Sequence, residues 1–331
     1  MTDAPISAPG AAVGRSLKVA LVVRAIANKA IPVATVAAAL IALWYLACIP
    51  MNAAQSALEA ERAGAELSTA PAERRTMSGL AVALRHPAEA VAGAFGQERP
   101  RLPAPHQVAA ELWETTVQKK VTSKRSLVFH AGITLSSTVL GFAIGSALGI
   151  ALAVGIVHSR VVDLSVMPWA IASQTIPILA LAPMIIVVLN SVGMQGLVPK
   201  AVISAYLSFF PVTVGMVKGL RAPGQADLDL MRTWSASRLR TLLSLRLPTS
   251  LPYLFASLKI AIAAALVGAI IGELPTGAVR GLGARLLAGS YYGQTIQIWS
   301  ALFGAAIVAA TLVAAIALIE RATLRAMGLN R

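Results

Sequence analysis

The sequence predicts an all-α, polytopic membrane protein with six transmembrane helices. Of its 331 residues, 57% are hydrophobic and only 13% are charged, and the mean hydropathy is +0.73. The core of a water-soluble protein of this size does not need such an apolar excess. Several apolar runs also reach the length of about 20 residues that a helix needs to cross a bilayer.

Six apolar runs define the spans in order along the chain. We place them at about 31–50, 130–157, 164–190, 197–217, 251–273 and 298–320. The first run is too long for a signal peptide and lacks a suitable cleavage site, so we expect it to remain in the mature protein. Residues 1–16 are small and polar and contain proline, which predicts a disordered start to an N-terminal tail over residues 1–30.

The distribution of Lys and Arg predicts which side of the membrane each loop faces. The loop after the fourth span carries six basic residues: Lys218, Arg221, Arg232, Arg238, Arg240 and Arg246. The short loops on the other side carry three: Lys200, Arg280 and Arg285. Because short cytoplasmic loops are enriched in basic residues, we place the N-terminus in the cytoplasm. The basic group formed by Lys119, Lys120, Lys124 and Arg125 opposes this orientation but is the weaker signal.

Residues 51–129, between the first two spans, then form an extracytoplasmic insert. The stretch QSALEAERAGAELSTAPAERR is rich in alanine and charge, which predicts an exposed helix that continues the first span. GQERPRLPAPHQ is a Pro-rich connector, and the apolar residues after it have the spacing of a helix on the membrane surface: Val108, Leu112, Trp113 and Val117. An extracytoplasmic cap and a spacer without ligands both remain open. A core of five spans, 130–322, and a cytoplasmic tail, 323–331, complete the chain.

Composition and motifs exclude several classes of function. The net charge of +14 is spread between apolar runs rather than along one stripe with aromatic residues, so we expect no nucleic-acid partner. The chain has no Walker A motif, and its four histidines are too scattered for a metal site. Its single cysteine, Cys48, allows no disulfide framework. We therefore predict no catalytic residue, no metal and no bound cofactor.

The second span carries small residues at every fourth position: Ser137, Gly141, Gly145, Gly149 and Ala153. This spacing puts them on one helix face, where another backbone can approach closely. The approaching helix belongs either to the same subunit or to a second copy.

The third span contains Pro168, Pro177 and Pro183, each of which removes a backbone donor. Such irregular backbone is tolerated in a membrane only where protein or a wet cavity covers it, so we expect this span to face the interior. Its polar side chains, with Tyr206 of the fourth span, contact either other helices or a substrate: Gln174, Thr175 and Asn190.

Two charged residues lie in the fifth span. Lys259 is close enough to the cytoplasmic end to extend its ammonium group to the interface. Glu273 lies near the outer end, before a short LPTG turn. It either lines a pathway or forms a structural ion pair or cap for the next short helix.

The loop between the fourth and fifth spans contains a basic amphipathic segment, LDLMRTWSASRLRTLLSLRLP, over residues 228–248. Leu228, Met231, Trp234 and Arg238 recur at helical spacing. A helix of this kind either docks into a groove on a partner or lies on anionic lipid.

This segment resembles the cytoplasmic EAA loop of permease subunits in bacterial binding-protein-dependent ABC importers. Asp229, Leu230 and Met231 stand at the E-A-A positions, Ser235 at the glycine, and Leu247-Pro248 at the later L-P. The run ASRLRTLLSLRLPTSLPYLFASLKIA and the following VGAIIGEL are similar to permeases of the nitrate, sulfonate and taurine type. The resemblance covers about residues 103–322.

The resemblance implies a type I permease fold in the bacterial inner membrane. Two copies of the permease would form a pathway that opens alternately to each side, driven by a cytoplasmic ABC ATPase dimer that holds the ATP and Mg. An extracytoplasmic substrate-binding protein would deliver the solute, and membrane lipid would surround the helices. A self-contained secondary transporter is the alternative.

The resemblance also implies two sets of functional residues. The loop 221–248 would contact the ATPase through Asp229, Met231, Arg232, Trp234, Ser235, Arg238, Leu247 and Pro248. We expect the pathway to be lined by Gln174, Thr175, Pro177, Asn190, Tyr206 and Glu273. The runs DLMRTWSAS and VGAIIGELP look most like permeases for riboflavin or pyrimidine precursors, while aliphatic sulfonates remain open.

Overall fold

The computed structural model describes residues 10–275 and 280–328, and every regular element among them is a helix. This confirms the predicted all-α class. Contacts within the chain divide it into two units, residues 1–107 and residues 108–331. Each unit is described by itself below.

The first unit is built on one long helix, α1 (Gly10–Arg62), which contains the predicted first span. Residues 10–16, predicted to be disordered, belong to this helix, and residues 1–9 lie outside the described part. The expected continuation of the span into the insert is observed, but it ends at Arg62. Gly64 then takes a positive φ of 94°, a conformation that glycine adopts without a Cβ clash.

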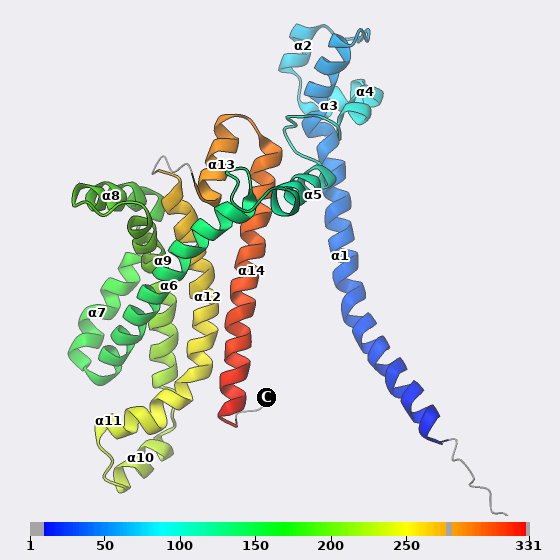
Figure 1. Cartoon of the computed structure of the whole chain (residues 1–331). Helices are drawn as coiled ribbons and strands as arrows, with labels where there is room; N and C mark the ends of the chain where they lie inside the picture. Colours follow the sequence, from blue (N-terminus) through cyan, green and yellow to red (C-terminus); the bar gives the residue numbers. More distant parts are fainter. Residues whose placement is uncertain (1–9, 276–279, 329–331) are drawn as a thin grey trace, which may run out of the picture. The chain divides into compact units, whose positions relative to one another are not determined.

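Three short helices pack around the end of α1: α2 (Pro71–Thr76), α3 (Gly79–Arg85) and α4 (Pro87–Gly93) (Figure 1). They share a small apolar core that includes Ala53, Ala57 and Val82. The buried Asn52 amide donates to the carbonyl oxygens of Ala94 (2.9 Å) and Leu102 (2.8 Å). This part of the insert is therefore folded against the end of α1, and the contacts do not distinguish a cap from a spacer without ligands.

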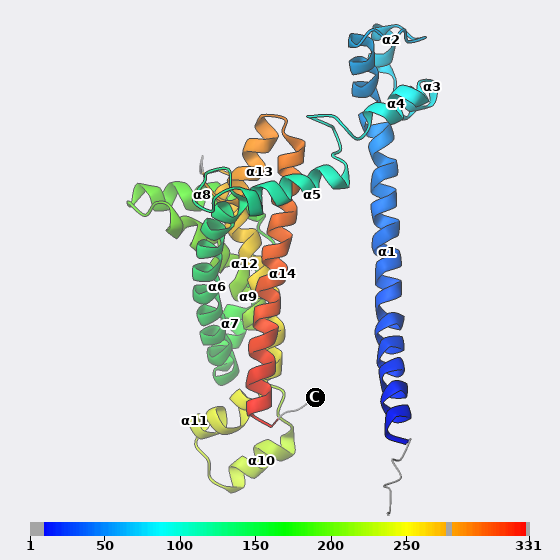
Figure 2. The same cartoon turned by 45° about the vertical axis from the view of Figure 1, so that its right-hand side comes forward.

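The boundary between the two units falls within α5 (Pro105–Trp113), which is followed by the π-helical turn η1 (Glu114–Gln118). The sequence predicted these two elements as one surface helix. The membrane helices of the second unit are α6 (Leu127–His158), α9 (Leu197–Leu220), α12 (Leu247–Glu273) and α14 (Thr295–Ala326). Shorter helices α7, α8, α10, α11 and α13 connect them (Figure 2).

Helix α9 lies between α6 and α12 and packs closely against both. A Cβ atom on Gly145 of α6 would lie 2.7 Å from the carbonyl oxygen of Ala205 on α9, and one on Gly149 would lie 2.7 Å from that of Phe209. Only glycine permits such an approach. The small-residue face of the second span is thus filled by a helix of the same subunit, which was one of the two predicted alternatives.

The predicted third span, 164–190, is not one continuous helix. It consists of α7 (Arg160–Ser173) and α8 (Ile178–Ser191), which meet at an angle of 101°. The break falls at Pro177, which has no N–H group and disfavours helical backbone in the residue before it. Five helices are long and apolar enough to cross a membrane, and the bent pair makes a sixth span if it is counted as one.

Candidate coupling loop and buried polar network

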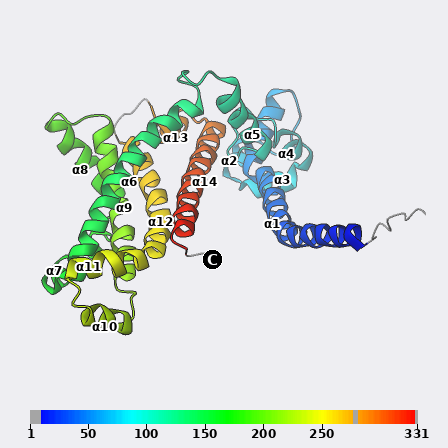
Figure 3. The same cartoon turned by 60° about the horizontal axis from the view of Figure 1, so that its bottom comes forward.

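The loop between α9 and α12 contains two helices, α10 (Gln225–Thr233) and α11 (Arg238–Thr241), followed by the π-helical turn η2 (Leu242–Arg246). Figure 3 shows α10 and α11 beyond the ends of α9 and α12. The sequence predicted one helical face from Leu228 to Arg238. That prediction is wrong, because the helix stops at Thr233 and a new one starts at Arg238.

The stop is a Schellman turn centred on Ser235. The N–H of Ala236 donates to the carbonyl of Met231 (3.0 Å), and the N–H of Ser235 donates to that of Arg232 (2.9 Å). Ser235 has a φ of 50° and is the only non-glycine residue with a positive φ in the described part of the chain. Position 235 is where the EAA pattern has glycine, and the left-handed backbone explains that preference.

Most side chains of α10 are exposed, Leu228 and Met231 are half-buried, and none is fully buried. Trp234 is 69% exposed and Leu230 is 48% exposed, so both large apolar side chains are open to solvent. Asp229 pairs with Arg232 at 2.8 Å on the same helix. Five of the eight predicted contact residues are thus exposed, whereas Met231, Leu247 and Pro248 are half-buried.

The base of the loop is fixed to the membrane helices. Arg246 donates to the carbonyl oxygen of Leu220 at the end of α9 (3.0 Å). Leu247 packs against the buried cluster that contains Leu220 and Met216, and Pro248 lies in the first turn of α12, where its missing N–H leaves no donor unpaired. These contacts attach the loop to the ends of two membrane helices, α9 and α12.

The predicted pathway residues divide into three places. Gln174, Thr175 and Pro177 are exposed at the elbow between α7 and α8, and the Tyr206 hydroxyl of α9 donates to the carbonyl of Ser173 at the same elbow. Asn190 lies 13 residues after Pro177 on α8, about 20 Å along a helix. Four of the six predicted pathway residues therefore lie together at the elbow: Gln174, Thr175, Pro177 and Tyr206.

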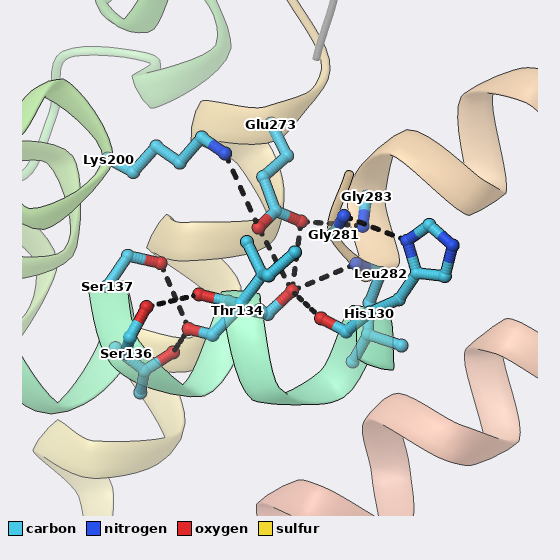
Figure 4. A network of polar contacts seen from close by, with 11 residues as sticks. His130, Thr134, Ser136, Ser137, Lys200, Glu273, Gly281, Leu282 and Gly283 are labelled. Carbon is cyan, nitrogen blue, oxygen red and sulfur yellow. Dashed lines mark hydrogen bonds and ion pairs between the residues drawn. The ribbon is translucent and has the colours of Figure 1, made fainter. Parts of the chain in front are cut away.

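Glu273, the sixth, is fully buried in a polar network (Figure 4). Its carboxylate accepts from the Thr134 hydroxyl at 3.0 and 3.1 Å and from the N–H of Gly283 at 2.8 Å. The Lys200 ammonium lies 3.8 Å away. These contacts favour the second alternative, a structural ion pair and cap for α13 (Leu282–Tyr291).

Two further residues complete the network. His130 Nδ1 accepts from the N–H of Gly281 (2.9 Å), and its Nε2 donates to the carbonyl of Lys124 (2.9 Å), which fixes a neutral tautomer. The Thr134 hydroxyl accepts from the N–H of Leu282 (2.9 Å). The first turn of α13 is thereby attached to α6 and α12. Sequence reasoning missed His130 and Thr134, because neither residue has a local signal.

Two ion pairs connect other helices of this unit. The Lys259 ammonium pairs with Glu320 of α14, so it has a protein partner and need not extend to the interface. Arg285 of α13 lies 3.7 Å from Glu111 of α5. Burial raises the pKa of the Glu111 carboxyl, while the neighbouring Arg285 acts in the opposite direction. The surface helix is thus held to the membrane helices by a partly buried pair.

A helical multi-pass chain with an exposed, basic loop anchored on two of its membrane helices has the architecture of a transporter membrane component. Residues 145–327 match the family described as "binding-protein-dependent transport system inner membrane component". Because this match covers more than half of the chain, the chain belongs to that family.

Three other proteins are similar in sequence to this chain. A "probable ABC transporter permease protein" of Haemophilus influenzae is 36% identical over 50% of this chain and 66% of its own length. The formylaminopyrimidine transport permease protein ThiX of Halalkalibacterium halodurans is 32% identical over 55% of this chain and 68% of its own length. The riboflavin transport system permease protein RibX of Chloroflexus aurantiacus is 30% identical over 68% of this chain and 80% of its own length. The chain thus spans just under two thirds of the first relative.

Proposed function

We propose that this chain is the membrane-spanning subunit of an ATP-driven importer and that its 221–248 loop receives the motion of a separate ATPase. The single observation that carries this proposal is the loop itself. It presents Trp234 and Leu230 to solvent, and its base is hydrogen-bonded to the end of α9 and continues directly into α12. A partner that binds the tip can therefore move the membrane helices.

The remaining parts of the importer follow from family membership. A cytoplasmic ABC ATPase dimer would hold ATP and Mg, a second copy of the permease would complete the pathway, and an extracytoplasmic binding protein would supply the solute. The N-terminus would be cytoplasmic, as the positive-inside rule requires. The permease chain itself would carry no catalytic residue.

The pathway in this proposal runs past the elbow between α7 and α8. Irregular backbone is tolerated at membrane depth only where it is covered by protein or lines a wet cavity. The elbow has exposed Gln174 and Thr175 side chains, and Tyr206 braces it from α9. We assign Glu273 to the support of α13, and Asn190 to a separate position along the same helix pair.

For the substrate, we propose a small heteroaromatic compound. Relatives named for riboflavin and formylaminopyrimidine transport are 30% and 32% identical to this chain, whereas one named for aliphatic sulfonates is 24% identical. The Gln174 amide and the Thr175 hydroxyl at the elbow can hydrogen-bond a flat polar ring, and Tyr206 can stack on it. Stimulation of ATP hydrolysis by binding protein loaded with riboflavin, a pyrimidine or a sulfonate distinguishes these classes.

Photo-crosslinking tests the role of the loop. Benzoylphenylalanine placed at Trp234 is expected to crosslink to the ATPase, because the side chain is exposed at the tip. The same group at Thr311, exposed in the middle of α14, should give only lipid adducts. Absence of an ATPase adduct at position 234 in an assembly that hydrolyses ATP would contradict the proposal.

A further inference from the structure

A pocket of about 480 Å³ lies between the end of α6, the α10–α11 loop and the start of α12. Four of its lining residues carry basic groups: His158, Arg232, Arg238 and Arg246. No Asp or Glu is among the lining residues. The pocket is therefore a concave site with an excess of positive charge, contributed by four separate elements.

The guanidinium groups are held in different ways. Arg246 is oriented by its hydrogen bond to the carbonyl of Leu220 (3.0 Å), and Arg232 by its pair with Asp229 (2.8 Å). The Arg238 side chain makes no hydrogen bond or ion pair with another described residue. His158 donates from Nδ1 to the carbonyl of Val154 (2.8 Å), so its ring is fixed as well. Two preset arginines and one unpaired arginine suit a multivalent oxyanion.

The position of the pocket indicates the source of that anion. Its walls include the last residues of α6, Val157 and His158, and the last residue before α12, Arg246. Both places are ends of membrane-spanning helices, where lipid headgroups lie. Arg232 and Arg238 belong both to the pocket and to the residues predicted to contact the ATPase, whereas the exposed Trp234 and Leu230 do not line the pocket.

We propose that this pocket binds a phosphate group, supplied by the headgroup of an anionic lipid or by a free phosphate. A phosphate oxygen can accept from the unpaired Arg238 and from the remaining donors of Arg246 at the same time, which joins α11 to the base of the loop. That the phosphate belongs to a lipid rests on the membrane orientation given under the proposed function. Binding of the phosphate group itself rests only on the basic residues of the pocket.

Native mass spectrometry of the purified full chain in a neutral detergent tests the proposal. One ligand arm uses phosphatidylglycerol, a second uses diacylglycerol with the same acyl chains but no phosphate, and a third adds inorganic phosphate as a competitor. We expect one tightly bound phosphatidylglycerol and no specific diacylglycerol. Displacement of the lipid by millimolar phosphate would show that free phosphate reaches the same site.

Matched variants locate the binding. Arg238→Gln with Arg246→Gln is expected to weaken phosphatidylglycerol binding at least about tenfold, since two charge-assisted contacts are lost. The control Arg240→Gln with Arg325→Gln removes the same charge from exposed residues outside the pocket and should change binding less than about twofold. Should the first double variant fold poorly, Arg238→Gln alone is expected to weaken binding at least about threefold, because this side chain has no hydrogen-bond or ion-pair partner among the described residues.

Three results would overturn the proposal: equal binding by the two double variants, equal retention of diacylglycerol and phosphatidylglycerol, or no retained ligand in any arm. If the wild-type chain binds neither lipid nor phosphate but Arg238→Gln weakens its complex with the ATPase, the pocket receives an acidic side chain of that partner instead. The ligand-binding measurements contain no ATPase, whereas the crosslinking test requires it. Failure of the phosphate proposal can therefore be distinguished from failure of the proposed coupling to the ATPase.

Discussion

Replacing Ser235 by glycine should stabilise the coupling loop, even though it removes a side chain. The residue has a φ of 50°, and this left-handed backbone costs an L-residue about 1–2 kcal/mol. Glycine avoids that cost, but its extra freedom in the unfolded loop offsets up to about 1 kcal/mol. The difference lies between about 0 and 2 kcal/mol, and we expect a net gain of about 0.5–1 kcal/mol, near its middle, for the Schellman turn that ends α10.

Hydrogen exchange measures this gain locally. The amides of α10 and of residues 235 and 236 should exchange about 2–5 times more slowly in Ser235→Gly, because exchange there requires local opening of the turn. Ser244→Gly is the matched control: Ser244 lies in the π-helical turn η2, where glycine is expected to destabilise by about 0.5–1 kcal/mol and speed exchange. Unchanged or faster exchange around position 235 would refute the reasoning.

The remaining predictions concern the helix packing. Glu273→Leu leaves the Lys200 ammonium and the Gly283 amide without their carboxylate, so it should lower the free energy of unfolding by about 3–5 kcal/mol. The loss should appear as a lower melting temperature of the purified chain, and Glu273→Gln should lose less. A wild-type melting temperature for the leucine variant would contradict the network. Lys259→Met removes the partner of Glu320 and should reduce the yield of folded protein in size-exclusion chromatography. Adding Glu320→Gln should restore that yield. A double variant no better than the single one would argue against the ion pair. Gly145→Leu should abolish folding because its Cβ meets the α9 backbone, whereas Gly132→Leu, whose Cβ meets nothing within 4 Å, should fold normally.

The sequence predicts those features that depend on local pattern. An apolar run of about 20 residues specifies a span by its length alone, so five spans agree with single helices of the structure. The resemblance placed Ser235 at a glycine position, and the positive φ explains why that position is special. The charge distribution in the loop after α9 likewise follows from membrane insertion rather than from tertiary contacts.

Features that depend on distant residues could not be predicted. Pro168, Pro177 and Pro183 have equivalent local effects, yet of these three only Pro177 lies at a sharp break, where the Tyr206 hydroxyl of α9 donates to the Ser173 carbonyl. The role of Glu273 depends on a hydroxyl 139 residues earlier in the chain. No periodicity or spacing within the fifth span encodes that contact.

The predicted single helix over the loop failed for a related reason. Leu228, Met231 and Trp234 have helical spacing, and that part of the pattern does describe α10. The following serine, however, adopts the left-handed conformation that ends the helix. Periodicity reports which residues share a face, but it does not report where a backbone turn interrupts that face.

Coupling between the loop and the ATPase is the central claim, and one ratio measures it directly. In proteoliposomes that contain permease, ATPase and binding protein, solute imported per ATP hydrolysed should fall at least about tenfold in Trp234→Ala. Loss of such an exposed aromatic anchor typically costs about 2–4 kcal/mol of binding. Trp113→Ala, an equal truncation of an exposed tryptophan on α5, should leave the ratio unchanged. A wild-type ratio for Trp234→Ala, or import by the permease alone without ATPase, would contradict the account.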